Sequence, residues 1–139
     1  MTTRQIYITR NDLTRLEELL RTARTFSEER DSDYLGQLEA LLEGSYTVSA
    51  REVPADVVTM NSRVRLTSAD GGSSTVYTVV FPADADAARQ RVSVLAPLGA
   101  ALLGCRVGQD AVWETPEGTR RLGVAEMLYQ PEAAGDYHL

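Results

Sequence analysis

Apolar residues in the first third of the chain recur every three or four positions. The first stripe consists of Leu13, Leu16, Leu19, Leu20 and Ala23. After the polar segment 24–33, a second stripe consists of Tyr34, Leu35, Leu38, Leu41 and Leu42. This spacing predicts two amphipathic helices, because positions three and four apart share one helix face. Such short helices are marginal alone in water, so an antiparallel α-hairpin packed on the rest of the protein is expected.

Residues that favour helix ends flank these two stripes. Thr9 or Asn11 can cap the first helix, and Asp12 stands three residues after Thr9 as a weak capping box. Gly44 follows the second stripe and is placed to end that helix in the left-handed conformation. We therefore predict a helical hairpin arm over residues 1–46.

From residue 62 onward the pattern changes to alternation, which is typical of strands. The strand-type segments are 62–68, 75–81, 91–96, 111–115 and 120–129. Between the third and fourth of them, Pro97 begins and Gly104 ends a short apolar segment, which predicts a helix of about two turns. Residues 47–139 are thus expected to form an antiparallel sheet of about five strands with one short helix, ending in an irregular tail of ten residues. The fold class is α+β.

The bulk properties exclude several classes of function. The chain has 139 residues, of which 43% are hydrophobic, so it can form one real core. Its net charge of -6 disfavours binding to the phosphate backbone of nucleic acids. No apolar stretch reaches membrane-spanning length and no signal-like segment begins the chain, so a cytoplasmic protein without membrane contact is expected. Every basic residue is arginine, which excludes Schiff-base and P-loop lysine chemistry.

Side chains for catalysis are scarce. Cys105 is the single cysteine, so an internal disulfide and a multi-thiolate metal site are excluded. The single histidine, His138, is the penultimate residue, where an oriented catalytic imidazole is not expected. Trp113 and two phenylalanines supply few aromatic rings for a pocket of the prolyl-isomerase type. We predict no catalytic residue, no metal and no cofactor.

Acidic residues gather in the turn between the two predicted helices. They are Glu28, Glu29, Asp31 and Asp33. Clustered carboxylates at a projecting tip can hold a divalent cation, because hard cations prefer oxygen ligands. The alternative is a solvated turn between helices, and the pattern alone favours that interpretation.

Three separated segments resemble a known family. They are "PADVVTMNSRVR", "LAPLGAALLGCRVG" and "YQPEAAGDY". The segment around Pro97 resembles the C-terminal domain of the Gre transcript-cleavage factors. Over nearly all of residues 53–139 the likeness is greater to one branch, the Rnk family of regulators of nucleoside diphosphate kinase. The hairpin arm resembles that family in architecture rather than in its letters.

The resemblance implies a fold, a partner and a docking site. It implies an FKBP-like domain without isomerase activity, preceded by a short coiled coil, that binds bacterial RNA polymerase at the rim of the secondary channel. The docking turn maps onto Leu95, Ala96 and Pro97, although a Gre factor tends to carry an acidic residue at the position of Leu95. The acidic tip would then face the channel and complement a basic wall.

Arm length separates this chain from a Gre factor. Gre hairpin helices are about twice as long, whereas about 14 residues here span roughly 21 Å at 1.5 Å per residue. The two metal-holding acids of a Gre factor would fall near Ser27 and Arg30. The resemblance therefore implies a non-enzymatic regulator that competes with Gre factors without stimulating transcript cleavage, and that affects nucleoside diphosphate kinase indirectly. An active cleavage factor with a short arm and an FKBP-like peptide-binding or isomerase module stay open as alternatives.

Overall fold

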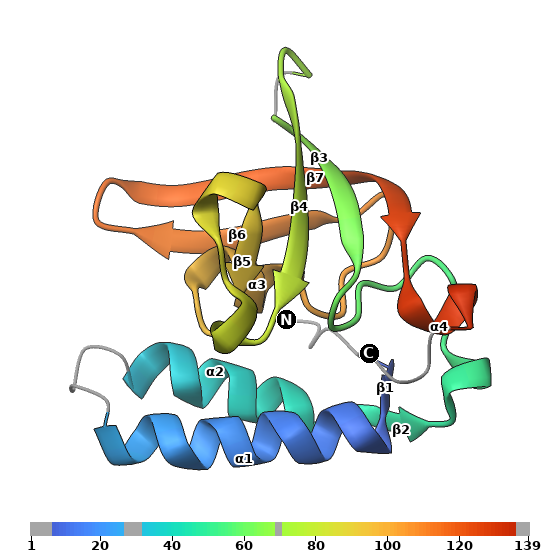
Figure 1. The fold of residues 1–139 in the computed structure, drawn as a ribbon. Helices are drawn as coiled ribbons and strands as arrows, with labels where there is room; N and C mark the ends of the chain where they lie inside the picture. The colour runs from blue at the N-terminus through green and yellow to red at the C-terminus, as the bar shows by residue number, and fades with distance from the viewer. Residues whose placement is uncertain (1–6, 27–31, 69–70, 136–139) are drawn as a thin grey trace.

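A pair of helices lies along one side of a curled β-sheet (Figure 1). The computed structural model describes residues 7–26, 32–68 and 71–135. Glu28, Glu29, Asp31 and His138 lie outside the described residues, and so does the side chain of Asp33. The observed combination of helices and sheet confirms the α+β class.

Both predicted helices are present. Helix α1 spans Arg10–Phe26 and helix α2 spans Ser32–Glu43. Thr9 caps α1, because its Oγ1 accepts a hydrogen bond from the Asp12 amide at 3.2 Å. Leucines of both predicted stripes are buried, with exposed fractions of at most 5% for Leu16, Leu20, Leu38 and Leu42.

The end of α2 differs from the prediction. Gly44 is not among the described glycines with positive φ, so it does not end the helix in the left-handed conformation. Instead, the amide and the hydroxyl of Ser45 both donate to the carbonyl oxygen of Leu42, at 3.1 Å and 2.6 Å. These bonds satisfy a terminal carbonyl without a left-handed residue.

Five strands form the main sheet, in the spatial order β5-β4-β3-β7-β6. The strands are β3 (Arg63–Ser68), β4 (Ser74–Val80), β5 (Arg91–Ser93), β6 (Asp110–Thr115) and β7 (Gly118–Tyr129). Helix α3 spans Pro97–Leu102, where the proline–glycine signal placed it, and Gly104 after it has a φ of 84°. The predicted number of strands and the short helix are confirmed.

One pairing in this sheet corrects the expectation of an antiparallel sheet. Strand β5 runs parallel to β4 over three residue pairs, from Thr78 with Arg91 to Val80 with Ser93. The connection between them carries two 3₁₀ turns, η3 (Pro82–Asp84) and η4 (Ala87–Arg89). Parallel neighbours need a crossover of about ten residues or more, which this connection supplies.

Three further elements were not predicted. Strands β1 (Tyr7–Thr9) and β2 (Tyr46–Val48) pair in parallel at the base of the arm. Helix α4 (Pro131–Ala134) lies within the segment that was expected to be an irregular tail. Each has only three or four residues, which is too short for a periodic pattern. A short 3₁₀ turn, η2 (Ala50–Glu52), links the arm to the sheet.

A single hydrophobic core joins the arm to the sheet. Leucines of both arm helices and buried residues of β3, β4, α3 and β7 belong to one continuous cluster, which includes Leu16, Leu38, Val64, Val79, Leu102 and Val124. Within the described residues, no helix is long and apolar enough to cross a membrane.

Helix α3 approaches β5 unusually closely at Gly99. A Cβ added there would lie 2.0 Å from the carbonyl oxygen of Ser93. Only glycine therefore allows α3 to sit at this distance from the strand, and the contact fixes the position of the helix.

We expect Gly99→Ala to destabilise the protein by about 2 kcal/mol or more, because backbone must move to admit the methyl group. Thermal unfolding followed by circular dichroism measures this. Gly36→Ala is the matched control: Gly36 lies within α2 and a Cβ there meets nothing within 4 Å. That change should be neutral or stabilising by up to about 1 kcal/mol. Equal stability of the two variants would contradict the role given to Gly99.

Candidate protein-docking surface

The turn between β5 and α3 is the surface predicted for docking, and the structure brings Leu95, Ala96 and Pro97 together there. Ser93 organises the turn: its Oγ accepts from the Leu95 amide at 3.1 Å and its carbonyl accepts from the Ala96 amide at 3.0 Å. Pro97 occupies the first turn of α3, where its missing amide hydrogen costs nothing.

The three turn residues are half-buried. The side chain of Leu95 packs against the core cluster while part of it stays accessible. Two contacts therefore hold the turn in place: the packing of Leu95 on the core, and the close approach of Gly99 to the backbone of Ser93. A rigid, partly apolar turn can bind a protein partner with little loss of conformational entropy.

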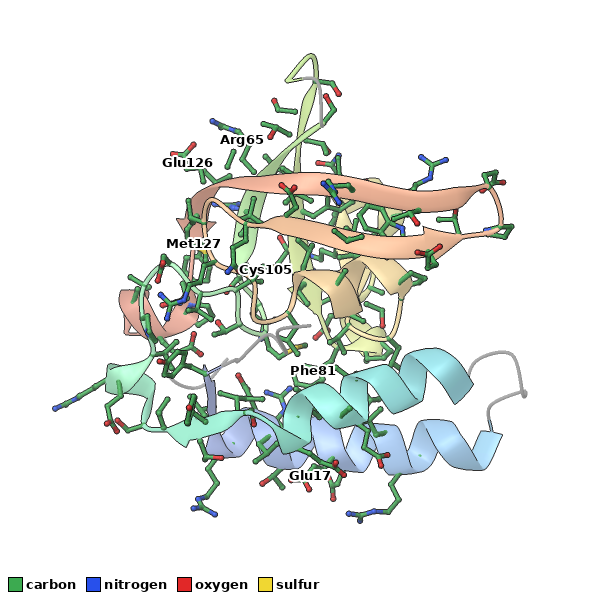
Figure 2. The ribbon with its side chains drawn as sticks, turned by 180° about the vertical axis from the view of Figure 1, so that it is seen from behind. Glu17, Arg65, Phe81, Cys105, Glu126 and Met127 are labelled. Atoms are coloured by element: carbon green, nitrogen blue, oxygen red, sulfur yellow. The ribbon has the colours of Figure 1, made fainter. Side chains whose placement is uncertain are left out.

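The arm packs directly beside this turn. Helix α2 contacts α3, and the guanidinium of Arg15 on α1 lies 4.0 Å from the centre of the Phe81 ring. Phe81 follows β4 and lies between the sheet and the helices (Figure 2). A cation over an aromatic face is attractive, so this contact adds to the apolar packing between arm and sheet.

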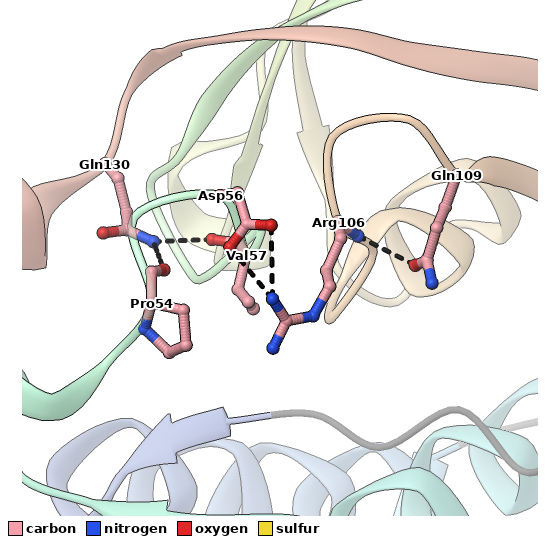
Figure 3. Close-up of polar contacts among 6 residues, drawn as sticks. All are labelled: Pro54, Asp56, Val57, Arg106, Gln109 and Gln130. Carbon is pink, nitrogen blue, oxygen red and sulfur yellow. Dashed lines mark hydrogen bonds and ion pairs between the residues drawn. The ribbon is translucent and has the colours of Figure 1, made fainter.

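The segment after β7 is fastened to the start of the sheet region by Gln130. The Gln130 amide group donates to the carbonyl oxygens of Pro54 and Val57, at 2.8 Å and 2.7 Å (Figure 3). Its Oε1 accepts from the Ala133 amide at 3.2 Å and so caps α4. Buried backbone carbonyls need partners, and one glutamine side chain satisfies two of them while starting a helix.

Arg106 makes a neighbouring link. Its guanidinium donates to both carboxylate oxygens of Asp56, at 3.1 Å and 3.2 Å (Figure 3). The same guanidinium lies 5.6 Å from the centre of the Tyr7 ring in β1. It therefore connects the base of the arm with the loop that follows α3.

Two acidic side chains that interact electrostatically are buried, Asp12 in the first turn of α1 and Glu132 in α4. Asp12 is 3% exposed and Glu132 is 9% exposed. Glu132 accepts a hydrogen bond from the Thr59 hydroxyl at 2.6 Å. Burial and then the charge of Glu132 raise the pKa of Asp12 to about 7, although Arg15 and a hydrogen bond with Thr9 act in the opposite direction.

The structure offers little chemistry for catalysis among its described residues. No group of three or more His, Cys, Asp or Glu side chains in this part of the chain could hold a metal ion. Cys105 is buried, and its thiol donates to the carbonyl oxygen of Ala101 at 3.1 Å. Trp113 on β6 is half-buried and packs against the core cluster.

Sequence reasoning missed the buried polar contacts at the base of the arm. Asp12 was identified only as part of a capping box, and Gln130 and Glu132 were placed in an irregular tail. No local signal reveals these contacts, since their partners lie far away in the chain.

The comparisons with known proteins agree with this architecture. Residues 53–129 match the family model for the C-terminal part of the transcription elongation factors GreA/GreB, and residues 4–43 match that for the Rnk N-terminus. The solved structure of a prokaryotic transcription elongation factor GreA/GreB from Nitrosomonas europaea is similar, with a TM-score of 0.76 and 36% sequence identity. The superposition covers 89% of this chain and 99% of that one. The fold is thus that of a GreA/GreB-type protein.

Two relatives place the chain more closely. The regulator of nucleoside diphosphate kinase from Escherichia coli K12 is 50% identical over 103 residues, which cover 73% of this chain and 76% of the relative. Transcription elongation factor GreA from Clostridium perfringens strain 13 is 33% identical over 88 residues, but only 56% of that protein is covered. The chain belongs to the Rnk family, with an Rnk-type N-terminal part and a GreA/GreB-type C-terminal part.

The buried carboxyl of Asp12 predicts a pH dependence of stability. Its pKa rises from 3.8 to about 7 in the folded protein, so the folded state binds this proton more tightly than the unfolded state does. Its contribution to stability is therefore present below about pH 4 and is lost as the pH rises to about 7.

We expect Asp12→Asn to be more stable than wild type at pH 8 by a few kcal/mol, since each pKa unit corresponds to about 1.4 kcal/mol. The two proteins should converge near pH 4. Denaturant unfolding at several pH values measures the difference, with the exposed Asp84→Asn as control. A difference between Asp12→Asn and wild type that stays constant over this pH range would contradict the assignment.

Proposed function

We propose that this protein is a non-enzymatic transcription regulator that binds bacterial RNA polymerase at the rim of the secondary channel and competes there with Gre factors. The observation that carries the proposal is the GreA/GreB-type fold, in which the Leu95–Pro97 turn is held rigidly beside a short helical arm. Docking relies on that turn, and the arm occupies the entrance of the channel.

The rigidity of the turn supports this role. Gly99 lets α3 pack against the backbone of β5, and the Ser93 side chain bonds to the Leu95 amide. A partner therefore meets a preformed apolar surface and does not have to order a loop, which favours binding.

The reach of the arm supports binding without transcript cleavage. Helix α1 has 17 residues and α2 has 12, which correspond to about 25 Å and about 18 Å. Leu20 of α1 still belongs to the core cluster, so only about 9 Å of that helix extends beyond its last buried leucine. Figure 1 shows both helices running along the sheet rather than projecting far past it. Such an arm would stop short of a deeply buried catalytic centre.

The name of the Escherichia coli relative refers to regulation of nucleoside diphosphate kinase. We propose that this effect is indirect and passes through transcription, because the docking turn and the arm are features shared with GreA/GreB-type proteins. Purified protein should then leave the activity of purified kinase unchanged.

Substitution of Pro97 tests the docking turn. We expect Pro97→Ala to weaken binding to core RNA polymerase by about fivefold or more, because the proline ends the turn and begins α3. Competition against a Gre factor for core polymerase measures the change. Pro116→Ala, in the exposed turn between β6 and β7, is the matched control and should bind like wild type.

The proposal fails if wild type does not bind the polymerase. Binding by Pro97→Ala that equals wild type would remove Pro97 from the docking surface. Circular dichroism of both variants establishes that a loss of binding does not come from unfolding.

A transcript-cleavage assay tests the second part of the proposal. We expect the full-length protein to leave backtracked RNA uncleaved in the presence of Mg²⁺ and to slow cleavage by an added Gre factor, because the two would compete for one site. Magnesium-dependent shortening of the RNA by this protein alone would instead support an active cleavage factor that presents its acidic tip.

A further inference from the structure

A row of polar side chains crosses the outer face of the sheet, opposite the core. Strand pairing aligns Tyr129 with Arg63, Arg63 with Thr78, and Thr78 with Arg91. Directly paired residues point to the same face, so these four side chains share it. Strands lie about 4.8 Å apart, which places the backbones of Arg63 and Arg91 roughly 10 Å apart on either side of Thr78.

This row lines an open pocket with a volume of about 470 Å³. Val80 is buried and lies next along β4 on the same face. Asn61 and Asp84 also line the pocket. The backbone of Asn61 has a φ of 67°, and asparagine is among the residues that tolerate this left-handed conformation. The pocket is therefore built from β7, β3, β4, β5 and the turns next to them.

The two arginines of the pocket have no ionic partner among the residues that the structure describes. Two other arginines differ in this respect. Arg65, two positions along β3 on the same face, pairs with Glu126 at 2.8 Å (Figure 2). Arg106 pairs with Asp56 at 3.1 Å. The two arginines and the carboxylate of Asp84 together give the pocket one net positive charge, whereas the overall charge of the protein is -6.

The pocket adjoins the proposed docking turn. Ser93 pairs with Val80 and so lies on the same outer face, two residues along β5 from Arg91. The hydroxyl of Ser93 is the group that accepts from the Leu95 amide and shapes the turn. Arg91, at the edge of the pocket, is thus only four residues before Leu95 in the chain, so a partner of ordinary interface size bound at Leu95, Ala96 and Pro97 can reach the pocket.

We propose that the Arg63–Arg91 pocket is a second part of the docking surface and receives an acidic segment of the polymerase. This inference rests on the proposed function. Guanidinium groups bind carboxylates in a bidentate manner, and two of them on one sheet face can hold two carboxylates of one segment. The apolar turn supplies contact area, while the arginine pair selects the partner and its orientation.

Nucleic acid fits this surface less well than an acidic protein segment. The phosphate backbone requires several cations, whereas this pocket has one net positive charge and includes the carboxylate of Asp84. The adjoining Leu95–Pro97 turn is apolar and half-buried, which suits a protein surface.

Binding of the full-length protein to core RNA polymerase tests the proposal. The variant is Arg63→Gln with Arg91→Gln, and the matched control is Arg51→Gln with Arg120→Gln, which removes the same charge from exposed positions elsewhere. Dissociation constants are measured at about 50 mM and about 300 mM NaCl, since exposed ion pairs weaken with salt. We expect about tenfold weaker binding for the pocket variant at low salt, with a smaller dependence on salt than wild type has, and binding within about twofold of wild type for the control.

The outcomes separate this inference from the proposed function. If wild type does not bind, the proposed function fails and the inference fails with it. If Pro97→Ala binds weakly while the pocket variant binds like wild type, docking stands and the second contact is wrong. The inference is equally wrong if pocket and control variants lose the same affinity, or if the pocket variant loses only retention on heparin. Thermal unfolding of each variant checks that the fold is retained.

Discussion

The packing of the arm leucines into the core of the sheet is the contact on which the rest of the structure depends. Leu16 and Leu38 are almost completely buried, in the same cluster as Val64 and Leu102. Burial of a leucine side chain stabilises the folded state by about 2 kcal/mol. The four buried arm leucines, which also include Leu20 and Leu42, therefore contribute more stability than two short helices have on their own in water. The arm is therefore a fixed part of the molecule along most of α1.

This packing also determines what the protein can do. An arm held against the sheet keeps a constant angle to the Leu95–Pro97 turn, since α2 contacts α3. A partner would meet the turn and the arm as one preformed surface. Because most of the length of the helices packs against the sheet, little of the arm projects beyond it. Such an arm is suited to occupying the entrance of a channel and is too short to carry carboxylates to a distant metal ion.

The junction has a cost. Asp12 is buried beside Glu132, and like charges in a site poor in water are unfavourable when both are ionised. The hydrogen bond from Thr59 to Glu132 and the nearby Arg15 offset part of this cost. Apolar residues in place of these two acids would therefore make the protein more stable at neutral pH.

Periodic patterns made the main elements predictable. The apolar stripes predicted both arm helices, and the alternating pattern predicted the strands of the main sheet. Pro97 and Gly104 predicted α3. The parallel entry of β5 and the β1–β2 pair depend on partners distant in the chain, so no local pattern revealed them. Helix α4 depends on Gln130, whose side chain bonds to the carbonyls of Pro54 and Val57.

The candidate site was predictable only in part. Residues 95–97 were identified through the resemblance to Gre factors, and the structure shows that they form one ordered turn. The arginine pocket was not identified, because it depends on strand register. Arg63 and Arg91 are 28 positions apart in the chain, and they share one sheet face only because both pair with Thr78. Glu28, Glu29, Asp31 and the side chain of Asp33 lie outside the described part of the structure, so the role of the acidic tip stays a prediction.

Native-state hydrogen exchange tests most directly whether the arm is a fixed part of the protein. We predict that the amides of Leu16, Leu20 and Leu38 exchange with the same opening free energy as those of Val64 and Val79, because one core must open for all of them. If the amides of the arm exchange through a separate opening of much lower free energy while the sheet stays protected, the arm moves independently and the account is wrong.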